Sequence, residues 1–390
     1  MRRRFKIAAL YTGGLLGPLG GGVVAPMLPQ IGRSVHASSG AVATSLTAYF
    51  VPFAAIQLVS GTLGERWGRR RTVQVAYVVY ALASLVCALS PSLVTFLAGR
   101  TAMGAANAFT SPLLLAGLGG AVAPERLSRA IGTFASFQAA GQSFAPLLGG
   151  VAAAISWRLA FVVVAVAGVL LAFAPPPGRP RPGAEAPAWG PLVSGRMGLL
   201  SAGAFLSHLC ASSLPFLVAL YADDALRLRP DLTGLVLVGF GLAGLVLGSV
   251  WGGLTDRFGP RACGILAAVV TGVFIATIGR TGSVTTLILC WTAAGAGASL
   301  LTVALQNLTM RAIPANRGGA LSAVSAFRFT GAAVAPLAWL PLYHAGPSHA
   351  FGAAGASLLL AVPALWATGR VAGGVTGEVT GEVTGGRAPG

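Results

Sequence analysis

The feature that most constrains this chain is a series of apolar runs, each about 20 residues long, that recurs along the sequence. A helix of that length crosses the hydrocarbon core of a bilayer, which is about 30 Å thick. Only 9% of the residues are charged, whereas soluble domains carry about 25%. So few charges cannot cover a water-exposed surface, and we therefore predict an all-α membrane protein.

Twelve hydrophobic spans can be placed along the chain. They cover roughly residues 7–29, 41–62, 73–89, 93–115, 130–151, 158–174, 197–221, 232–252, 263–281, 284–306, 320–342 and 350–368. With a cytoplasmic N-terminus, 19 of the 26 lysines and arginines fall in loops or ends on the cytoplasmic side. This excess follows the positive-inside rule and predicts that both termini are cytoplasmic.

The positive charge serves this topology rather than a nucleic-acid partner. The net charge is +17, but the arginines lie singly or in short clusters between apolar spans. We therefore expect the lipid bilayer, and no nucleic acid, as a partner. The abundance of alanine, glycine and arginine is typical of GC-rich genomes, which favours a bacterial inner (plasma) membrane.

Two polar stretches divide the chain. The proline-rich segment PPPGRPRPGAEAPAWG lies within residues 175–196, which we predict to be a cytoplasmic linker between six-helix bundles at 1–174 and 197–368. The repeat VTGEVTGEVTGG lies within residues 369–390, which carry too little apolar surface to pack and are predicted to form a disordered cytoplasmic tail.

A short pattern occurs twice, as GTLGERWGRRRT from Gly61 and as GGLTDRFGPR from Gly252. Six positions match at a constant offset of 191 residues, and each copy follows the second span of its half. The halves are therefore predicted to be parallel repeats, which form two pseudo-symmetric six-helix bundles. Many secondary transporters are built from such repeats, with substrate bound between the two halves.

This loop pattern resembles that of the major facilitator superfamily, with Glu65 where aspartate is usual. In that family the loop helps to hold the cytoplasmic side closed in the outward-facing state. The resemblance implies these gating residues: Gly61, Glu65, Arg66, Gly68, Arg69 and Arg70 in the first half, and Asp256 and Arg257 in the second. The simpler alternative is that the basic loops only anchor the topology.

The fifth span resembles the antiporter motif of the same superfamily. Gly141, Ala145 and Gly149 recur every four residues and would form a smooth ridge for close helix packing. Pro146 removes a backbone donor and permits a bend. The resemblance implies an exporter, most like the twelve-helix drug:proton antiporters. Ordinary packing of small residues is the alternative.

Polar residues within the spans are candidates for a substrate or proton path. Arg100, in RTAMG, resembles the arginine motif that the family links to proton coupling; the alternative is a structural anchor bonded to backbone carbonyls. The resemblance places further candidates around a central cavity: Asn107, Gln138, Gln142, His208 and Arg328. Each of these could equally make hydrogen bonds between helices.

The sequence offers no support for an enzyme. It contains no nucleophile–base set, phosphate loop or metal cluster, and the spacing of its four cysteines fits neither a metal site nor a disulfide framework. No cofactor is expected. The spans also contain no clearly embedded aspartate or glutamate, so a cavity bordered by Arg100 and Arg328 should favour neutral or anionic substrates over cations.

The sequence thus predicts a secondary active transporter, acting as a monomer, that exports small amphipathic compounds by alternating access with protons as the coupling ion. Asp223, Asp224 and His208 are the titratable groups nearest to the expected path. A carrier of a sugar or amino acid, working by uniport or symport on the same fold, is the first alternative. A membrane receptor or assembly factor that transports nothing is the second.

Overall fold

The described part of the chain consists of helices joined by short connections. The computed structural model describes residues 2–176, 188–211, 214–228 and 230–368, and these residues contain no β-strand. The first half contains α1 (Arg2–Gly22), η1 (Ala25–Met27), α2 (Leu28–Ser34), α3 (Ser39–Trp67), α4 (Arg69–Leu89), α5 (Leu93–Asn107), α6 (Ser111–Ala121), η2 (Pro124–Arg126), α7 (Leu127–Ile155) and α8 (Arg158–Ala172). The second half contains η3 (Gly190–Val193), α9 (Gly195–Ala211), α10 (Leu214–Asp224), α11 (Pro230–Phe258), α12 (Pro260–Ile278), α13 (Val284–Ala312), η4 (Pro314–Asn316), α14 (Arg317–Ala345), α15 (Pro347–Leu359) and α16 (Ala361–Ala367).

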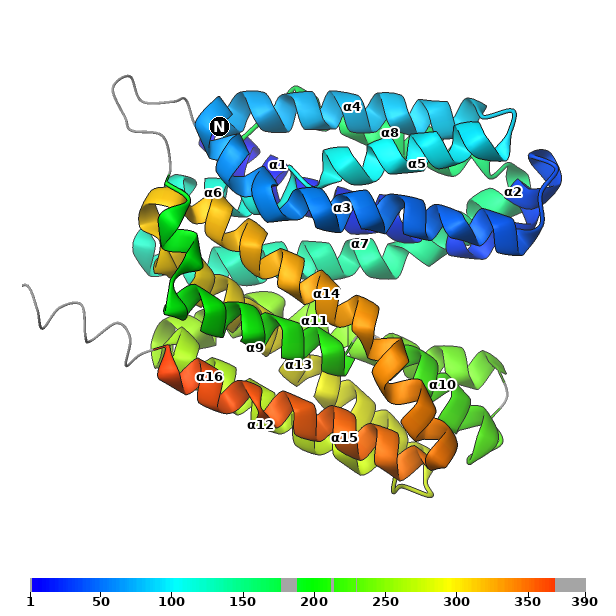
Figure 1. The fold of residues 1–390 in the computed structure, drawn as a ribbon, viewed down its shortest axis with the longest axis vertical. Helices are drawn as coiled ribbons and strands as arrows, with labels where there is room; N and C mark the ends of the chain where they lie inside the picture. The colour runs from blue at the N-terminus through cyan, green and yellow to red at the C-terminus, as the bar shows by residue number, and fades with distance from the viewer. Residues whose placement is uncertain (1, 177–187, 212–213, 229, 369–390) are drawn as a thin grey trace, which may run out of the picture.

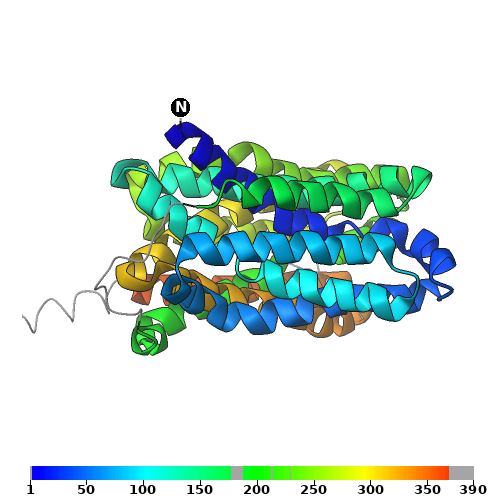
Figure 2. The same ribbon diagram turned by 90° about the horizontal axis from the view of Figure 1, so that it is seen from above.

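These helices make twelve membrane spans. By length and composition, seven segments of the described chain can cross a membrane: Thr44–Trp67, Arg69–Leu89, Val236–Phe258, Pro260–Ile278, Val284–Ala312, Pro314–Ala345 and Pro347–Ala367. The remaining spans are α1, α5 with α6, α7, α8, and α9 with α10, which run along the same direction as the others in two perpendicular views (Figures 1 and 2). The predicted fold class is therefore correct.

One predicted span, 93–115, is not the single helix that the hydropathy indicates. The chain breaks between Asn107 and Ser111, because Pro112 has no amide hydrogen to donate to the Ala108 carbonyl. That carbonyl accepts a hydrogen bond of 2.7 Å from the Ser60 hydroxyl of α3 instead. The Thr110 hydroxyl closes the turn by donating to the Asn107 carbonyl at 2.8 Å.

Two other predicted spans are also interrupted near prolines. The span predicted at 7–29 ends as α1 at Gly22, and the chain then forms η1 and α2, whose first turns contain Pro26 and Pro29. In the span at 197–221, α9 ends at Ala211 and α10 begins at Leu214, and residues 212–213 between them lie outside the described residues. The span at 350–368 is divided at Leu360, three residues before Pro363.

Buried apolar side chains form two clusters, one centred in each half of the chain; the first also includes Val303, Met310 and Leu321 of the second half. Phe96, Phe134 and Phe161 belong to the first cluster, and Trp291 and Phe351 to the second. The two clusters agree with two bundles, while the boundaries predicted at residues 174 and 197 remain predictions. Most of the predicted linker (residues 177–187) and the whole tail (369–390) lie outside the described residues.

The helix boundaries reproduce the internal repeat. α3 and α11 are both 29 residues long and begin 191 residues apart. α7 and α14 are also both 29 residues long, and they begin 190 residues apart. The short helices η2 and η4, which precede α7 and α14, show the same offset of 190. The two halves therefore carry equivalent helices in equivalent order.

The halves meet mainly through two helix pairs, α7 with α11 and α3 with α14. Within each half, α1 packs on α7 and α9 packs on α14, again as equivalent pairs. Both copies of the loop pattern lie at one end of the bundle, together with η2, η4 and the start of α9 (Figure 1). We call this the motif end; α1 begins there and α16 finishes there.

Candidate functional site

Each copy of the loop pattern forms a tight turn between two helices at the motif end. Gly68 connects α3 to α4 with φ of 92°, and Gly259 connects α11 to α12 with φ of 83°. A residue with a side chain is strained at such positive φ angles, whereas glycine adopts them freely. The turn geometry thus explains why both copies carry glycine at this position.

Two further glycines of the pattern let the halves touch backbone to backbone. A Cβ atom added to Gly61 would lie 1.9 Å from the carbonyl oxygen of Gly318 on α14. A Cβ atom added to Gly252 would lie 2.4 Å from the carbonyl oxygen of Ser128 on α7. These two contacts are equivalent in the repeat, and both join opposite halves. The motif end is therefore closed by direct backbone contact.

The acidic residues of the pattern lie at the N-termini of the same facing helices. Asp256 Oδ2 accepts a hydrogen bond of 3.2 Å from the backbone amide of Arg129, in the first turn of α7. Glu65 lies beside Gly318 in the first turn of α14, where a Cβ atom on Gly318 would be 3.0 Å from Glu65 Oε1. A carboxylate at this position interacts favourably with the positive end of the helix dipole.

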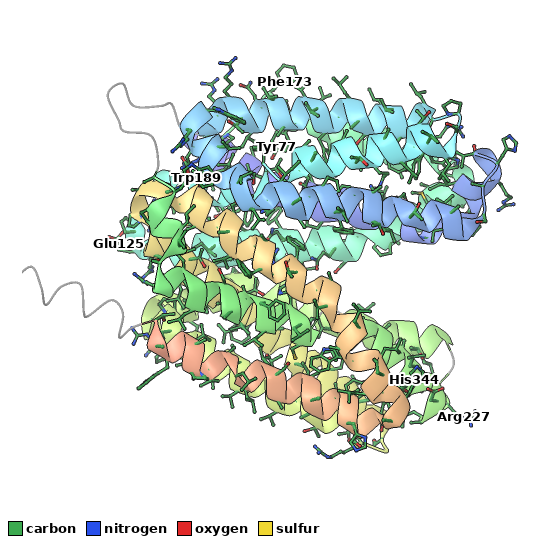
Figure 3. All side chains as sticks on the ribbon, in the orientation of Figure 1. Tyr77, Glu125, Phe173, Trp189, Arg227 and His344 are labelled. Atoms are coloured by element: carbon green, nitrogen blue, oxygen red, sulfur yellow. The ribbon has the colours of Figure 1, made fainter. Side chains whose placement is uncertain are left out.

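The basic residues of the pattern make different contacts. Arg69 forms an ion pair with Glu65, one helical turn away along the chain. The Arg66 guanidinium carbon lies 5.7 Å from the centre of the Trp189 ring, just before η3, and Figure 3 places Trp189 at the motif end. The Arg257 guanidinium carbon lies 5.3 Å from the ring of Phe258, and Arg70 is exposed.

Small polar side chains that the sequence analysis did not single out complete the α3–α14 contact. The Ser322 hydroxyl on α14 accepts from the Gly61 amide at 3.2 Å and donates to the Gln57 carbonyl. Asn316 donates to the Thr62 hydroxyl at 3.0 Å. The offset between the two halves could have pointed to these residues, because it makes the start of α14, which faces the first copy of the pattern, equivalent to the start of α7, which faces the second.

At the contact between α7 and α11, α13 also takes part. The Ser128 hydroxyl donates to Asn307 Oδ1 at 2.7 Å and accepts from Arg311 at 3.2 Å. Ser128 is also the residue whose carbonyl oxygen contacts Gly252. One residue at the start of α7 therefore connects to both α11 and α13 of the other half.

The small-residue ridge of α7 packs on α1 within the first half. A Cβ atom on Gly141 would lie 2.3 Å from the Leu15 carbonyl oxygen, and one on Gly149 would lie 2.3 Å from that of Val23. Ala145 is buried between them, beside Gly22 at the end of α1. Pro146 lies inside α7 on an exposed face. The ridge therefore allows α1 to approach α7 closely.

Arg100 is fully buried in the first half and bonded to backbone carbonyls. Its Nη1 and Nη2 atoms donate to Gly20 at 2.8 Å and to Gly21 at 3.1 Å, both in the last turn of α1. Its Nε atom donates to Ser45 at 3.5 Å, and its guanidinium carbon lies 4.4 Å from the Tyr49 ring centre on α3. These contacts are the ones expected of a structural anchor bonded to backbone carbonyls, the alternative role of Arg100.

A small cavity of about 30 Å³ lies between α9, α13 and α14 and is partly open to solvent. Arg328 and His208 both line it, as does Gln306. The remaining lining residues are Ala204 and Ser207 on α9, Thr302, Leu305 and Thr309 on α13, and Leu321, Val324 and Ser325 on α14. Gln306 Nε2 donates to Gln138 Oε1 at 3.4 Å, which connects the cavity wall to α7 of the other half.

The structure thus brings only some of the predicted path residues together. Arg328 and His208 share the cavity, and Gln138 reaches it through Gln306. Asn107 is buried at the end of α5, where it accepts from Thr110 at 2.8 Å, and it does not line the cavity. Gln142 is exposed on α7, also outside the cavity lining.

Comparison with known families identifies the fold. The family described as Major Facilitator Superfamily matches residues 10–228 and 200–380. The chain belongs to the major facilitator superfamily. This family and fold are those of multi-pass membrane transporters and not of enzymes.

Several members of the superfamily are similar to this chain in sequence. The multidrug efflux protein YfmO of Bacillus subtilis (strain 168) is 28% identical over 332 residues, which covers 82% of this chain and 81% of YfmO. The uncharacterized MFS-type transporter EfpA of Mycobacterium tuberculosis (strain ATCC 25618 / H37Rv) is 30% identical over 175 residues, or 44% of this chain. That match spans only 33% of the length of EfpA.

Solved structures of other superfamily members share the fold. The human organic anion transporter MFSD10 (TETRAN) superposes with a TM-score of 0.76 at 17% identity, covering 93% of this chain and 99% of that structure. The transporter FucP in the outward conformation superposes with a TM-score of 0.78 at 12% identity, covering 94% of this chain and 99% of that structure. At these identities the likeness concerns the fold alone.

Proposed function

We propose that this protein is a secondary active transporter that exports small amphipathic compounds, neutral or anionic, by alternating access coupled to proton antiport. The observation that carries the proposal is the pair of equivalent contacts, Gly61 with Gly318 and Gly252 with Ser128, which joins the two halves at the motif end. These backbone contacts and the few hydrogen bonds beside them can separate and re-form without breaking either bundle.

The transport cycle follows from the arrangement of the two halves. We place the motif end in the cytoplasm of a bacterial cell, with the protein in the inner membrane and both termini inside, as the loop charges predict. With the motif end closed, the substrate cavity faces outward. On switching, the halves separate at the motif end, and Glu65 and Asp256 leave the N-termini of α14 and α7.

Export is favoured over uptake by two observations. The ridge of Gly141, Ala145 and Gly149 packs on α1 as the antiporter resemblance implies, with backbone contacts at both glycines. Similar proteins carry names such as multidrug efflux protein YfmO of Bacillus subtilis and drug efflux pump JefA of Mycobacterium tuberculosis. The monomer is sufficient in this proposal, since each half supplies the partner helix for the other.

Proton coupling needs a group that gains and loses a proton during the cycle. No aspartate or glutamate of the sequence falls within the central part of a span. His208 borders the cavity beside Arg328, and its imidazole is the titratable group there whose ordinary pKa lies near physiological pH. We therefore assign the proton to His208 and not to Arg100, whose three guanidinium nitrogens each donate to a backbone carbonyl.

The proposal is tested by transport in proteoliposomes with an imposed pH gradient. Suitable probes are a permanent anion, 1-naphthalenesulfonate, its neutral analogue 1-naphthalenesulfonamide, and the cation trimethyl-1-naphthylammonium. We expect gradient-driven movement of the anionic or neutral compound, abolished by a protonophore. Transport that persists without any gradient would indicate a uniporter. Strong transport of the cation, unchanged in Arg328→Ala, would contradict the proposed selectivity.

A further inference from the structure

Among the residues that the structure describes, Arg328 has no partner that balances its charge. No hydrogen bond to its guanidinium group is present among the described residues, and its Nε atom is buried without an acceptor. Its guanidinium carbon lies 5.0 Å from the ring of Phe329, its neighbour on α14. Arg100, by contrast, donates to three carbonyls. Packing alone therefore accounts for Arg100 but not for Arg328.

The surrounding helices cannot supply a counter-charge. The sequences of α9, α13 and α14, which line the cavity, contain no aspartate or glutamate, and neither does that of α7, which reaches the cavity through Gln138. An arginine within a membrane span is costly unless it is paired or faces water. A bound anion would provide the missing charge and an acceptor for the guanidinium group.

The other polar groups of the cavity are neutral donors and acceptors. The Ser207 hydroxyl donates to the Ala204 carbonyl at 2.8 Å, so it can only accept from His208 Nδ1, which lies 3.1 Å away. A histidine side chain is neutral or positively charged, so His208 cannot balance the charge of Arg328 in either state. Gln306 Oε1 is buried without a hydrogen-bond partner.

The remaining wall is apolar. Leu305, Leu321 and Val324 line the same cavity as Arg328. A site with one cation, a few polar groups and aliphatic walls suits a ligand with a charged head and an apolar body. We propose that the cavity binds the anionic head group, a carboxylate or sulfonate, of an amphipathic molecule, with Arg328 as its charge partner. This inference rests on the proposed function and narrows its substrate class to anions.

The test is a binding measurement on the purified full-length protein, which needs no transport. The matched probes are 1-naphthalenesulfonate and 1-naphthalenesulfonamide, which share a ring system and differ in charge. We expect the sulfonate to bind at least about tenfold more tightly, because a hydrogen bond to a charged group is stronger than one between neutral groups. Arg328→Gln should reduce sulfonate binding to the level of the sulfonamide, and Arg328→Lys should retain part of the preference.

The matched control is Arg280→Gln. Arg280 is an exposed arginine that bonds to the Ala276 carbonyl and does not line the cavity, so its loss removes the same net charge without touching the site. Sulfonate affinity should be unchanged in this variant. Equal affinity for both probes, binding of neither, or sulfonate binding that survives Arg328→Gln would overturn the inference.

A second measurement concerns the protein without ligand. Arg328→Met replaces an uncompensated charge by an apolar side chain of similar length, so it should raise the melting temperature of the ligand-free protein and abolish the sulfonate-induced shift. A lower melting temperature would show that Arg328 has a stabilising partner, which contradicts the inference. Failure of the proposed function looks different, because vesicles would then show no gradient-driven transport while the purified protein still bound sulfonate through Arg328.

Discussion

Replacing Gly61 by alanine tests the idea that backbone contact closes the motif end. The added Cβ atom would lie 1.9 Å from the Gly318 carbonyl oxygen and 2.6 Å from Ser322 Cβ. Neither neighbour can rotate away. The first is helix backbone, and the second is a Cβ atom that the α14 backbone holds in place, one turn after Gly318. α3 and α14 would have to separate by roughly 1.5 Å to restore an ordinary van der Waals distance.

The magnitude follows from what such overpacking costs. Inserting a methyl group into a tightly packed contact destabilises it by about 1–3 kcal/mol. Only the state with the motif end closed contains this contact, so the penalty acts on the equilibrium between closed and open states. A change of that size alters the ratio of the two states by about 5- to 150-fold. Gly61→Ala should therefore favour the open motif end.

The assay measures the separation of the halves directly. Spin labels are placed at Arg71 and Arg261, which are exposed at the motif ends of α4 and α12. The distance between the two labels is measured by pulsed electron–electron double resonance. The native cysteines, which would also react, are replaced by alanine: Cys87, Cys210, Cys263 and Cys290. We expect one short distance in the parent protein and a major longer population in Gly61→Ala.

The matched control is Gly120→Ala in α6. A Cβ atom on Gly120 would meet no atom within 4 Å, so this variant adds the same methyl group near the motif end without a clash. Its distance distribution should equal that of the parent. If Gly61→Ala also kept the parent distribution and transported substrate at the parent rate, the reasoning that backbone contact closes this end would be refuted.

Three further variants test other parts of the structure. Asp256→Asn removes the carboxylate from the α7 N-terminus, an interaction worth about 0.3–1 kcal/mol, so the same spin labels should report about two- to fivefold more of the open state. Glu125→Gln should have no effect, and equal behaviour of the two variants would contradict the contact. Arg100→Gln leaves carbonyls of α1 and α3 without donors, and each unsatisfied carbonyl costs about 1–3 kcal/mol of folding stability. Thermal unfolding should therefore begin several degrees lower, and an unchanged melting temperature would exclude the anchor role. Gly149→Ala places a Cβ atom 2.3 Å from the carbonyl oxygen of Val23, just after α1, and should destabilise the protein by about 1–3 kcal/mol. Gly150→Ala meets nothing and should be neutral or slightly stabilising; equal melting temperatures for the two variants would disprove the ridge.

Much of the architecture could be predicted because it depends on local composition. Each span is an apolar run of the right length. The arginines of the loops predict on which side of the membrane each loop lies, and this orientation stays a prediction. The duplicated pattern at Gly61 and Gly252 predicted the internal repeat before any contact was known, and the equal lengths of α3 and α11 agree with it. The helix breaks were missed, because hydropathy averages over the single residue, Pro112, that interrupts hydrogen bonding.

The candidate site was predicted less completely. Arg328 and His208 were expected near a cavity, but nothing in the chain showed that both belong to one cavity of the second half while Asn107 does not. Likewise, a serine such as Ser322 has no distinguishing mark in a helix rich in small residues. Its role depends on which backbone groups of α3 lie opposite, and those are set by how the helices cross.

The sequence by itself thus determined the helical spans, the two-fold repeat and the glycines of the turns, because bilayer thickness and backbone conformation act on each segment separately. Only the tertiary structure decided that Arg100 is satisfied by carbonyls while Arg328 is left without a counter-charge. Both arginines lie in apolar helices and look alike in the chain. Their difference arises because the partner of a buried charge is chosen by the packing of helices that are distant in sequence.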